Sequence, residues 1–354
     1  MNRRIPGKIR AAAMLLIFIA AQTHFSALAQ SCPPPPPPPP PAAAGAQHPT
    51  LLQGYALRPP FRVAGVDYPV GVPAGTKLTD WQALSGPGIT VRADASPPYV
   101  RVDDTSNVVI SGVDFSLHGG AYLWFKNSPN PTVISSNFGG PNLTLISAGV
   151  INTDNWSPNL TVSYSTIDGA GMYVNIGVNG PGGSGLIFNQ GGGRNTVIHN
   201  WLKNAPEHTL EEVQLPTVPL VVIYRKNLIE QSGWGVASHP NYLQFGSGYI
   251  SCVDVKYNTF YNTPQASSGE SLQFYNNFNG YVHNAHWAYN VMIATGGIPG
   301  DARDYVIPGG GDQNSGVGHD NYVDTTAAFG LFYPGSMTSW TLRNNYNMVT
   351  GAPD

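Results

Sequence analysis

The stretch VDVKYNTFYNT (253–263) alternates apolar and polar side chains and then turns at an asparagine. Within it, Val253 and Val255 alternate with Asp254 and Lys256, and a period of two is typical of a β-strand that buries one face. A single unit of this length has too few apolar side chains to form a core. We therefore expect it to be one of several units that stack and bury a shared core.

The same phrase recurs along the chain with different residues, as in LVVIYRKNLIEQSG (220–233) and AHWAYNVMIATGG (285–297). The residues that mark the turn, asparagine or the serine that replaces it, lie 35, 27, 31, 32, 31 and 23 residues apart. They are Ser165, Asn200, Asn227, Asn258, Asn290, Asn321 and Asn344. Repeats of about 20–50 residues indicate a solenoid or a related array. Asparagine tolerates left-handed backbone and bonds neighbouring backbone groups, so the marked residues are expected to stack into a ladder.

Over residues 90–351 this pattern resembles the right-handed parallel β-helix of the pectin-lyase-like superfamily, which implies an all-β solenoid. That superfamily includes lyases, hydrolases, epimerases and non-catalytic surface proteins, so the resemblance implies no single activity. The composition agrees with a β fold, because only 10% of residues are charged and the chain holds 41 Gly, 32 Pro and 18 Tyr. A β-sandwich with long loops is the alternative. The recurring asparagine phrase favours the parallel β-helix with an N-terminal cap.

The N-terminal segment of the chain predicts export. Residues 1–29 read as a signal peptide, with a basic start, an apolar stretch and an Ala-x-Ala cleavage site that ends at Ala29. Residues 30–49 form a linker with one cysteine, nine consecutive prolines and small residues. Residues 50–107 lack the clear repeat and are expected to form the N-terminal cap and first coil, and residues 108–354 the β-helix. We expect a secreted protein, extracellular or periplasmic.

Charge and cysteine content restrict the partners. Removing the leader takes four basic residues from 17 and no acidic residue from 20, which leaves a net charge of −7. This argues against nucleic acid as a partner. No segment after the signal peptide is long and apolar enough to span a membrane. We expect a monomer whose partner is a polysaccharide. Nothing in the sequence brings Cys32 and Cys252 together.

Strand alternation predicts which side chains of neighbouring coils meet on the outer surface. Stacking the copies places Arg225 beside Lys256 and Asp254 beside His286. Neighbouring strands lie about 4.8 Å apart, so these side chains can reach one another. Two stacked cations are costly unless an anion compensates them, which makes this pair a candidate for ligand binding. The alternative is that Lys256 pairs with Asp254 or solvent.

A second internal match aligns HPNYLQF (239–245) with SGESLQF (268–274). It places Asn241 over Glu270 and Gln244 over Gln273, with both glutamines outward. The phrase His239-x-x-x-x-Gln244 resembles the active-site region of several carbohydrate-active β-helix families, although those families often have an acidic residue in place of Asn241. Stacked amides suit sugar hydroxyls. A purely structural amide ladder is the alternative.

These residues predict a secreted carbohydrate-active enzyme, either a polysaccharide lyase or a glycoside hydrolase, with one groove along residues 225–290. In a lyase, a base removes the proton α to a uronate carboxyl while cations neutralise that carboxylate. His239 or Lys256 would be the base and Arg225 the cation. The candidate catalytic residues are His239, Lys256, Arg225 and Glu270, and the candidate substrate-binding residues are Asn241, Gln244, Gln273, Asp254 and His286.

A hydrolase needs two carboxylates, and Glu270 with Asp254 is the candidate pair. The non-catalytic alternative is a surface-displayed β-helix that binds glycan or matrix. No metal-binding motif is present. His208 and Glu212 in PEHTLEEV (206–213) are four residues apart, which predicts one helical turn in a loop, and two groups do not make a metal site. No cofactor is identified, and calcium stays open.

Overall fold

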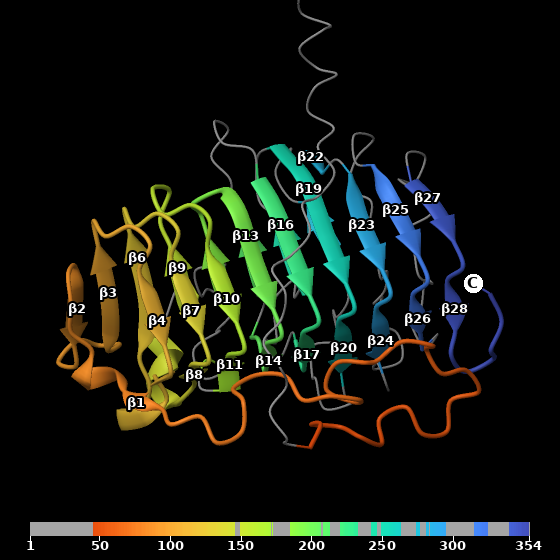
Figure 1. Cartoon of the computed structure of the whole chain (residues 1–354), viewed down its shortest axis with the longest axis horizontal. Helices are drawn as coiled ribbons and strands as arrows, with labels where there is room; N and C mark the ends of the chain where they lie inside the picture. The colour runs from red at the N-terminus through yellow and green to blue at the C-terminus, as the bar shows by residue number, and fades with distance from the viewer. Residues whose placement is uncertain are drawn as a thin grey trace, which may run out of the picture. The chain divides into compact units, whose positions relative to one another are not determined.

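The computed structural model describes residues 45–145, 149–170, 172, 185–206, 208–212, 220–232, 242–245, 249–262, 274–276, 281–282, 284–294, 315–324 and 340–353. All of them belong to one compact unit, Pro37–Asp354. Within these residues the chain forms three long sheets of stacked strands, all parallel except for the antiparallel pair β2 and β3. The predicted all-β fold, a right-handed parallel β-helix, is confirmed (Figure 1).

Each full coil contributes one strand to each sheet in the order sheet I, sheet II, sheet III. Sheet I contains β2 (Ile89–Arg92), β3 (Tyr99–Asp103), β6 (Tyr122–Lys126), β9 (Ile151–Thr153), β12 (Gly185–Asn189), β15 (His208–Glu212), β18 (Leu243–Phe245) and β21 (Phe274–Asn276). Sheet II contains β4 (Val109–Ser111), β7 (Thr132–Ile134), β10 (Thr161–Ser163), β13 (Gly193–Ile198), β16 (Leu220–Arg225), β19 (Tyr249–Lys256), β23 (Ala285–Ala288), β25 (Gly316–His319) and β27 (Trp340–Arg343), with β22 (Tyr281–Val282) paired to β19.

Sheet III contains β1 (Thr79–Asp80), β5 (Val113–Asp114), β8 (Asn137–Phe138), β11 (Thr166–Asp168), β14 (Trp201–Lys203), β17 (Leu228–Glu230), β20 (Thr259–Asn262), β24 (Val291–Ala294), β26 (Tyr322–Val323) and β28 (Tyr346–Asn347). Short 3₁₀ turns lie between strands of the described residues, among them η1 (Trp81–Ala83), η2 (Leu117–Gly119) and η3 (Pro141–Leu145). Figure 1 looks onto sheet II, whose strands β4 to β27 lie side by side.

The predicted inward positions of Val253 and Val255 are confirmed. Val253 and Val255 are 1% and 0% exposed and belong to one core that runs through the described coils. Tyr224 of β16 pairs in register with Val255 of β19, and Val255 with Trp287 of β23, so equivalent positions of successive coils stack inside. The core therefore grows by the stacking of neighbouring coils, as expected for a solenoid.

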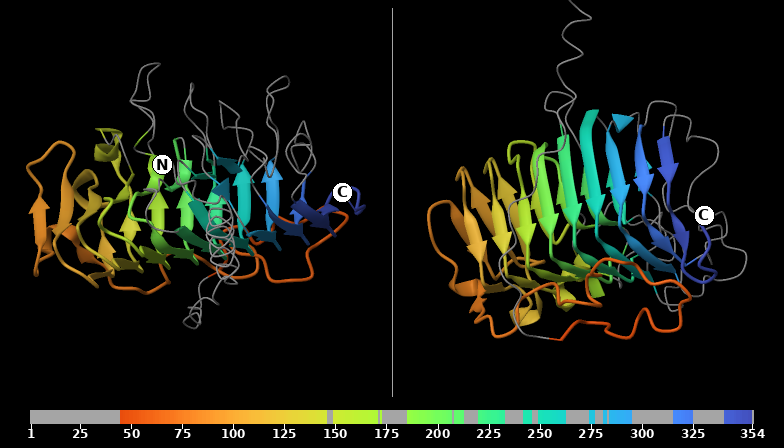
Figure 2. Two further views of the ribbon diagram at one scale, coloured as in Figure 1. Left: turned by 90° about the horizontal axis from the view of Figure 1, so that it is seen from above. Right: turned by 45° about the vertical axis from the view of Figure 1, so that its right-hand side comes forward.

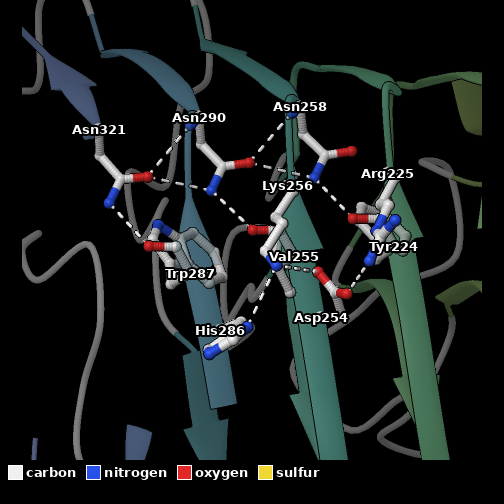
Figure 3. Close-up of polar contacts among 10 residues, drawn as sticks. All are labelled: Tyr224, Arg225, Asp254, Val255, Lys256, Asn258, His286, Trp287, Asn290 and Asn321. Carbon is white, nitrogen blue, oxygen red and sulfur yellow. Dashed lines mark hydrogen bonds and ion pairs between the residues drawn. The ribbon is translucent and has the colours of Figure 1, made fainter. Parts of the chain in front are cut away.

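A ladder of buried side chains runs along the turn between sheets II and III. Asn227 donates its backbone N–H and its side-chain amide to Asn258 Oδ1, and Asn258 does the same to Asn290 Oδ1. Each amide also donates to a carbonyl of the preceding coil, as Asn258 does to Tyr224 (Figure 3). The rungs are Ser136, Ser165, Asn200, Asn227, Asn258, Asn290, Asn321 and Asn345. The ladder satisfies backbone groups that no strand pairs.

The structure corrects two details of this ladder. Its last rung is Asn345, which is 2% exposed, and not Asn344, which is exposed. The left-handed backbone belongs to the residue before each rung, with φ of 59° at Tyr257 and 52° at Asn344. The rung itself contributes hydrogen bonds, and its buried amide explains why asparagine recurs there. The preceding residue turns the chain, and many residue types occupy that position.

The segment 50–107 was expected to cover the open end of the first coil, and its first part lies elsewhere. Residues 45–78 run along the outer face of sheet III, as the orange trace in Figures 1 and 2 shows. Leu57 N–H donates to the carbonyl of Met348 near the C-terminal end, and Gly71 N–H donates to His199. At Gly71 a Cβ would lie 2.6 Å from Thr166 Oγ1, so only glycine allows this approach. Residues 79–103 then form β1, η1, β2 and β3.

A polar stack lies inside the solenoid where sheet I ends. PEHTLEEV, expected to form a helical turn, contains β15, and Glu212 points into the core. Asn189 and Asn195 donate side-chain hydrogen bonds of 2.5 and 2.8 Å to Glu212 Oε2, and Thr153 donates to Asn189. Complete burial raises the pKa of Glu212 to about 8, although the two amides lower it in part. The carboxyl is therefore mostly protonated at neutral pH.

Candidate functional site

Four of the predicted site residues meet on the outer face of sheet II and form what we call the basic cluster: Arg225, Asp254, Lys256 and His286 (Figure 3). Register places Arg225 opposite Lys256 and Asp254 opposite His286, as strand alternation predicts. Arg225 Nη2 donates to Asp254 Oδ2, and Lys256 Nζ lies 3.4 Å from Asp254 Oδ1. The two register pairs predicted from strand alternation are therefore correct, and the contact between Arg225 and Asp254 was not predicted.

The basic cluster holds more positive than negative charge. Asp254 is 1% exposed and is shared by Arg225 and Lys256, which are 15% and 19% exposed. Lys226 follows Arg225 directly, and its pKa is lowered by burial and by the Arg225 charge. Arg225 Nε is a buried donor that makes no hydrogen bond within the described part of the chain. One carboxylate is thus shared by two cations, Arg225 and Lys256, so the basic cluster keeps an excess of positive charge.

His286 extends the basic cluster by one coil and serves as a neutral group. Its Nδ1 lies 3.1 Å from Lys256 Nζ, and an ammonium can only donate. Nδ1 therefore accepts, which leaves the ring proton of the neutral imidazole on Nε2. Burial lowers the pKa of His286, and the Lys256 charge lowers it further. At neutral pH the imidazole is uncharged and offers an N–H donor.

Arginine, lysine and histidine side chains continue along sheet II in a line that we call the basic row: Arg225, Lys256, His319 and Arg343. Ala288 fills the one coil between Lys256 and His319. Adjacent members of neighbouring strands are about 4.8 Å apart. His319 is paired with Asp320 at 2.6 Å, and Arg343 is exposed. The row follows the solenoid axis, the direction in which an extended polymer would lie.

Gln244 lies on a different sheet, so the predicted residues do not share one groove. It is on β18 of sheet I, opposite Glu211 of β15, and both are largely buried although alternation directs them outward. Its partner in the next coil is Tyr275 and not Gln273, so the LQF alignment was wrong by two residues. Glu211 was missed because PEHTLEEV was interpreted as a helical turn. HTLEE has one apolar residue, Leu210, so no apolar period of two marks this strand in the sequence.

Some of the predictions fall outside the described residues. They are His239, Asn241, Glu270 and Gln273. Cys252 lies on β19, in register with Val221 of β16, and is buried and disulfide-bonded. Cys32 is outside the described residues. In the part of the chain that is described, no helix is long and apolar enough to cross a membrane. Nor do three or more metal-binding side chains gather anywhere in these same residues.

Comparisons with known proteins add no name to this geometry. No protein-family model, no curated protein and no solved structure matches the chain. The parallel β-helix is therefore established by the chain's own sheets and ladder. The chemistry has to be argued from the basic cluster, because a fold of this kind hosts several activities. Beyond the parallel β-helix architecture, the chain is assigned to no family.

Proposed function

We propose that this chain is an exported member of the pectin-lyase-like superfamily that acts on an acidic extracellular polysaccharide as a polysaccharide lyase. Residues 1–29, which have the pattern of a signal peptide, support export. The asparagine ladder supports membership of the superfamily. The substrate class comes from the basic cluster. A uronate polymer carries a carboxylate on its sugar units, and this carboxylate is the group that Arg225 and Lys256 suit best.

One observation carries the proposal: two cations, Arg225 and Lys256, stand on adjacent strands with a single buried carboxylate, Asp254, between them. In a chain with only 10% charged residues, such a pair is unusual. Asp254 keeps both side chains in place but neutralises only one charge. A ligand carboxylate would neutralise the other.

The cluster favours elimination over hydrolysis. In β-elimination, cations stabilise the charge that develops on the uronate carboxylate as the α proton leaves. Arg225 and Lys256 would supply that stabilisation, and His286 an N–H donor. The proposed base stays His239 or Lys256. Hydrolysis would need Asp254 to reach a glycosidic bond, but its carboxylate is 1% exposed and is held by two cations.

A second candidate, a non-catalytic glycan-binding protein displayed at a surface, is favoured by the basic row. Arg225, Lys256, His319 and Arg343 follow one line over five coils. The three permanent cations on this line, Arg225, Lys256 and Arg343, can hold a polyanion without any chemistry. The two candidates share a ligand and differ in whether the bound polymer is cleaved.

Lys256→Gln is expected to weaken binding of polygalacturonate about tenfold, because one charge-assisted contact to the polymer is lost. Asp254 keeps Arg225 as its partner, so the variant should fold. The measurement is retardation in native gels that contain polygalacturonate, at low salt. Arg58→Ala, which removes an exposed cation elsewhere in the chain, is the matched control and should migrate like the parent protein.

The same protein incubated with polygalacturonate separates the two candidates. A lyase produces a new double bond, which raises ultraviolet absorbance, and Lys256→Gln should slow that rise. A binding protein is retarded in the gel but yields no product. Equal retardation of the parent protein, Lys256→Gln and Arg58→Ala would refute the assignment of the ligand to the basic cluster.

A further inference from the structure

The first strands of sheet I carry aromatic side chains on their outer face, away from the basic cluster on sheet II. On β3, Tyr99 and Arg101 alternate with core valines, and on β6, Tyr122 and Trp124 alternate with core residues. Register places Tyr99 opposite Tyr122 and Arg101 opposite Trp124. All four are partly exposed. We call these four residues the aromatic platform.

Contacts within the aromatic platform fix the positions of its rings. The rings of Tyr99 and Tyr122 have centroids 5.4 Å apart and are inclined by 39°. The Arg101 guanidinium lies 5.8 Å from the centroid of Trp124 and is held by Asp103 at 2.7 Å. Burial raises the pKa of Tyr122, and its neighbour Tyr99 raises it further. The surface thus combines fixed apolar ring faces with hydroxyl, guanidinium and carboxylate groups around them.

A further exposed aromatic side chain stands beside the platform. Trp156 is 68% exposed, the highest value among the large apolar side chains of the described residues. It lies on the turn after β9, where Asp154 accepts from the backbone of both Trp156 and Asn127. Asn127 directly follows β6, so this turn is tied to the end of the platform strand. Trp156 therefore lies on the turn beside the C-terminal end of β6, and a solvent-exposed indole of this kind is typical of a binding surface.

We propose that the aromatic platform, with Trp156 at its edge, binds sugar rings of a polysaccharide through their apolar faces. A pyranose has C–H faces that stack on aromatic rings and a rim of hydroxyls that hydrogen-bond to Tyr, Arg and Asp side chains. The two strands β3 and β6 present these groups about 4.8 Å apart along the solenoid axis, so a sugar chain can contact both strands at once. The inference does not depend on the proposed lyase activity, because stacking requires no charge on the sugar.

Two polymers distinguish the platform from the basic cluster: neutral hydroxyethylcellulose and acidic polygalacturonate, each cast into native gels. The platform is expected to retard the protein with one or both polymers at high salt, where charge contacts are screened. Tyr122→Ala and Trp124→Ala should each reduce this salt-resistant binding about tenfold. Tyr122→Phe keeps the ring and should retain most of the binding. Leu117→Ala, another exposed apolar change, is the control.

Circular dichroism melting curves of the variants check that the outer-face substitutions leave the core intact. Loss of binding with unchanged melting supports the platform. Three results would overturn it: no retardation by either polymer at high salt, equal retardation of Trp124→Ala, or a parent dimer that Trp124→Ala makes monomeric. The parent protein could bind polygalacturonate at low salt only, with Lys256→Gln weakening that binding. This result would support the proposed function and contradict the platform.

Discussion

Replacing Asn258 by alanine is expected to lower the free energy of unfolding by about 3–5 kcal/mol. The side chain accepts from both the backbone and the amide of Asn227, and it donates to the carbonyl of Tyr224 and to Asn290. Asn258 is 1% exposed, so water cannot replace these partners in the folded protein. Each buried group left without a partner costs about 1–3 kcal/mol. Urea unfolding of the purified protein measures the change.

Asn344→Ala is the matched control, because the sequence pattern assigns Asn344 to the same ladder but its side chain is exposed. Only its left-handed backbone resists substitution, at a cost of about 1 kcal/mol. Asn345→Ala should resemble Asn258→Ala, since Asn345 accepts from Asn321 and donates to Gly318. If Asn344→Ala were as damaging as Asn345→Ala, the assignment of the last rung would be wrong.

Glu212→Gln is expected to remove a loss of stability that the parent protein suffers as pH rises from 5 to 8. Burial raises the folded-state pKa of Glu212 from 4.5 to about 8, so in this range the folded protein binds a proton that the unfolded chain has released. Stability from this group is fully present below the unfolded pKa. It falls by about 1.4 kcal/mol for each pH unit as pH rises towards the folded pKa. The total between pH 5 and pH 8 is about 3–4 kcal/mol.

Glutamine keeps an acceptor for Asn189 and Asn195 but cannot ionise. Unfolding free energies of both proteins, measured at half-unit steps of pH, should therefore diverge in favour of Glu212→Gln as pH rises. Glu230→Gln is the control with the opposite sign. Burial raises the pKa of Glu230, but hydrogen bonds from His48 and Trp201 outweigh it and lower the pKa overall. Its contribution is therefore lost only at acid pH. Parallel curves for Glu212→Gln and the parent would show that Glu212 is not buried.

The main features of the fold were predictable because they are local and repeated. Alternation assigned Val253 and Val255 to the core, and nearly equal repeat lengths aligned Arg225 with Lys256 and Asp254 with His286. In every coil from β10 onward, the ladder residue is the second residue after the end of the sheet II strand. The position of the turn residue in the sequence therefore predicts the register of sheet II. The same reasoning predicted the basic cluster but not the internal ion pair that holds it.

The candidate site was harder to predict where loops of unequal length intervene. The LQF match suggested that Gln244 stacks on Gln273, but the hydrogen bonds of sheet I pair it with Tyr275. A short match between two sequence segments determines register less strongly than the hydrogen bonds between two strands. Every backbone group of a buried strand must be paired, and this requirement sets the register. The aromatic platform was not predicted either. Tyr99 and Tyr122 are recognised as neighbours only when β3 and β6 are placed in register.

The sequence by itself determined the architecture: strands with a period of two, a turn with a buried amide in each coil, and stacking of coils into one core. These depend on contacts between neighbours at fixed spacing. Only the tertiary structure decided that Asn345 is the last rung, that residues 45–78 lie along sheet III, and that Glu212 lies inside. It also separated Gln244 from the basic cluster. These features depend on which faces of distant segments meet, and that is settled by burial and hydrogen bonding across the whole solenoid and not by any local pattern.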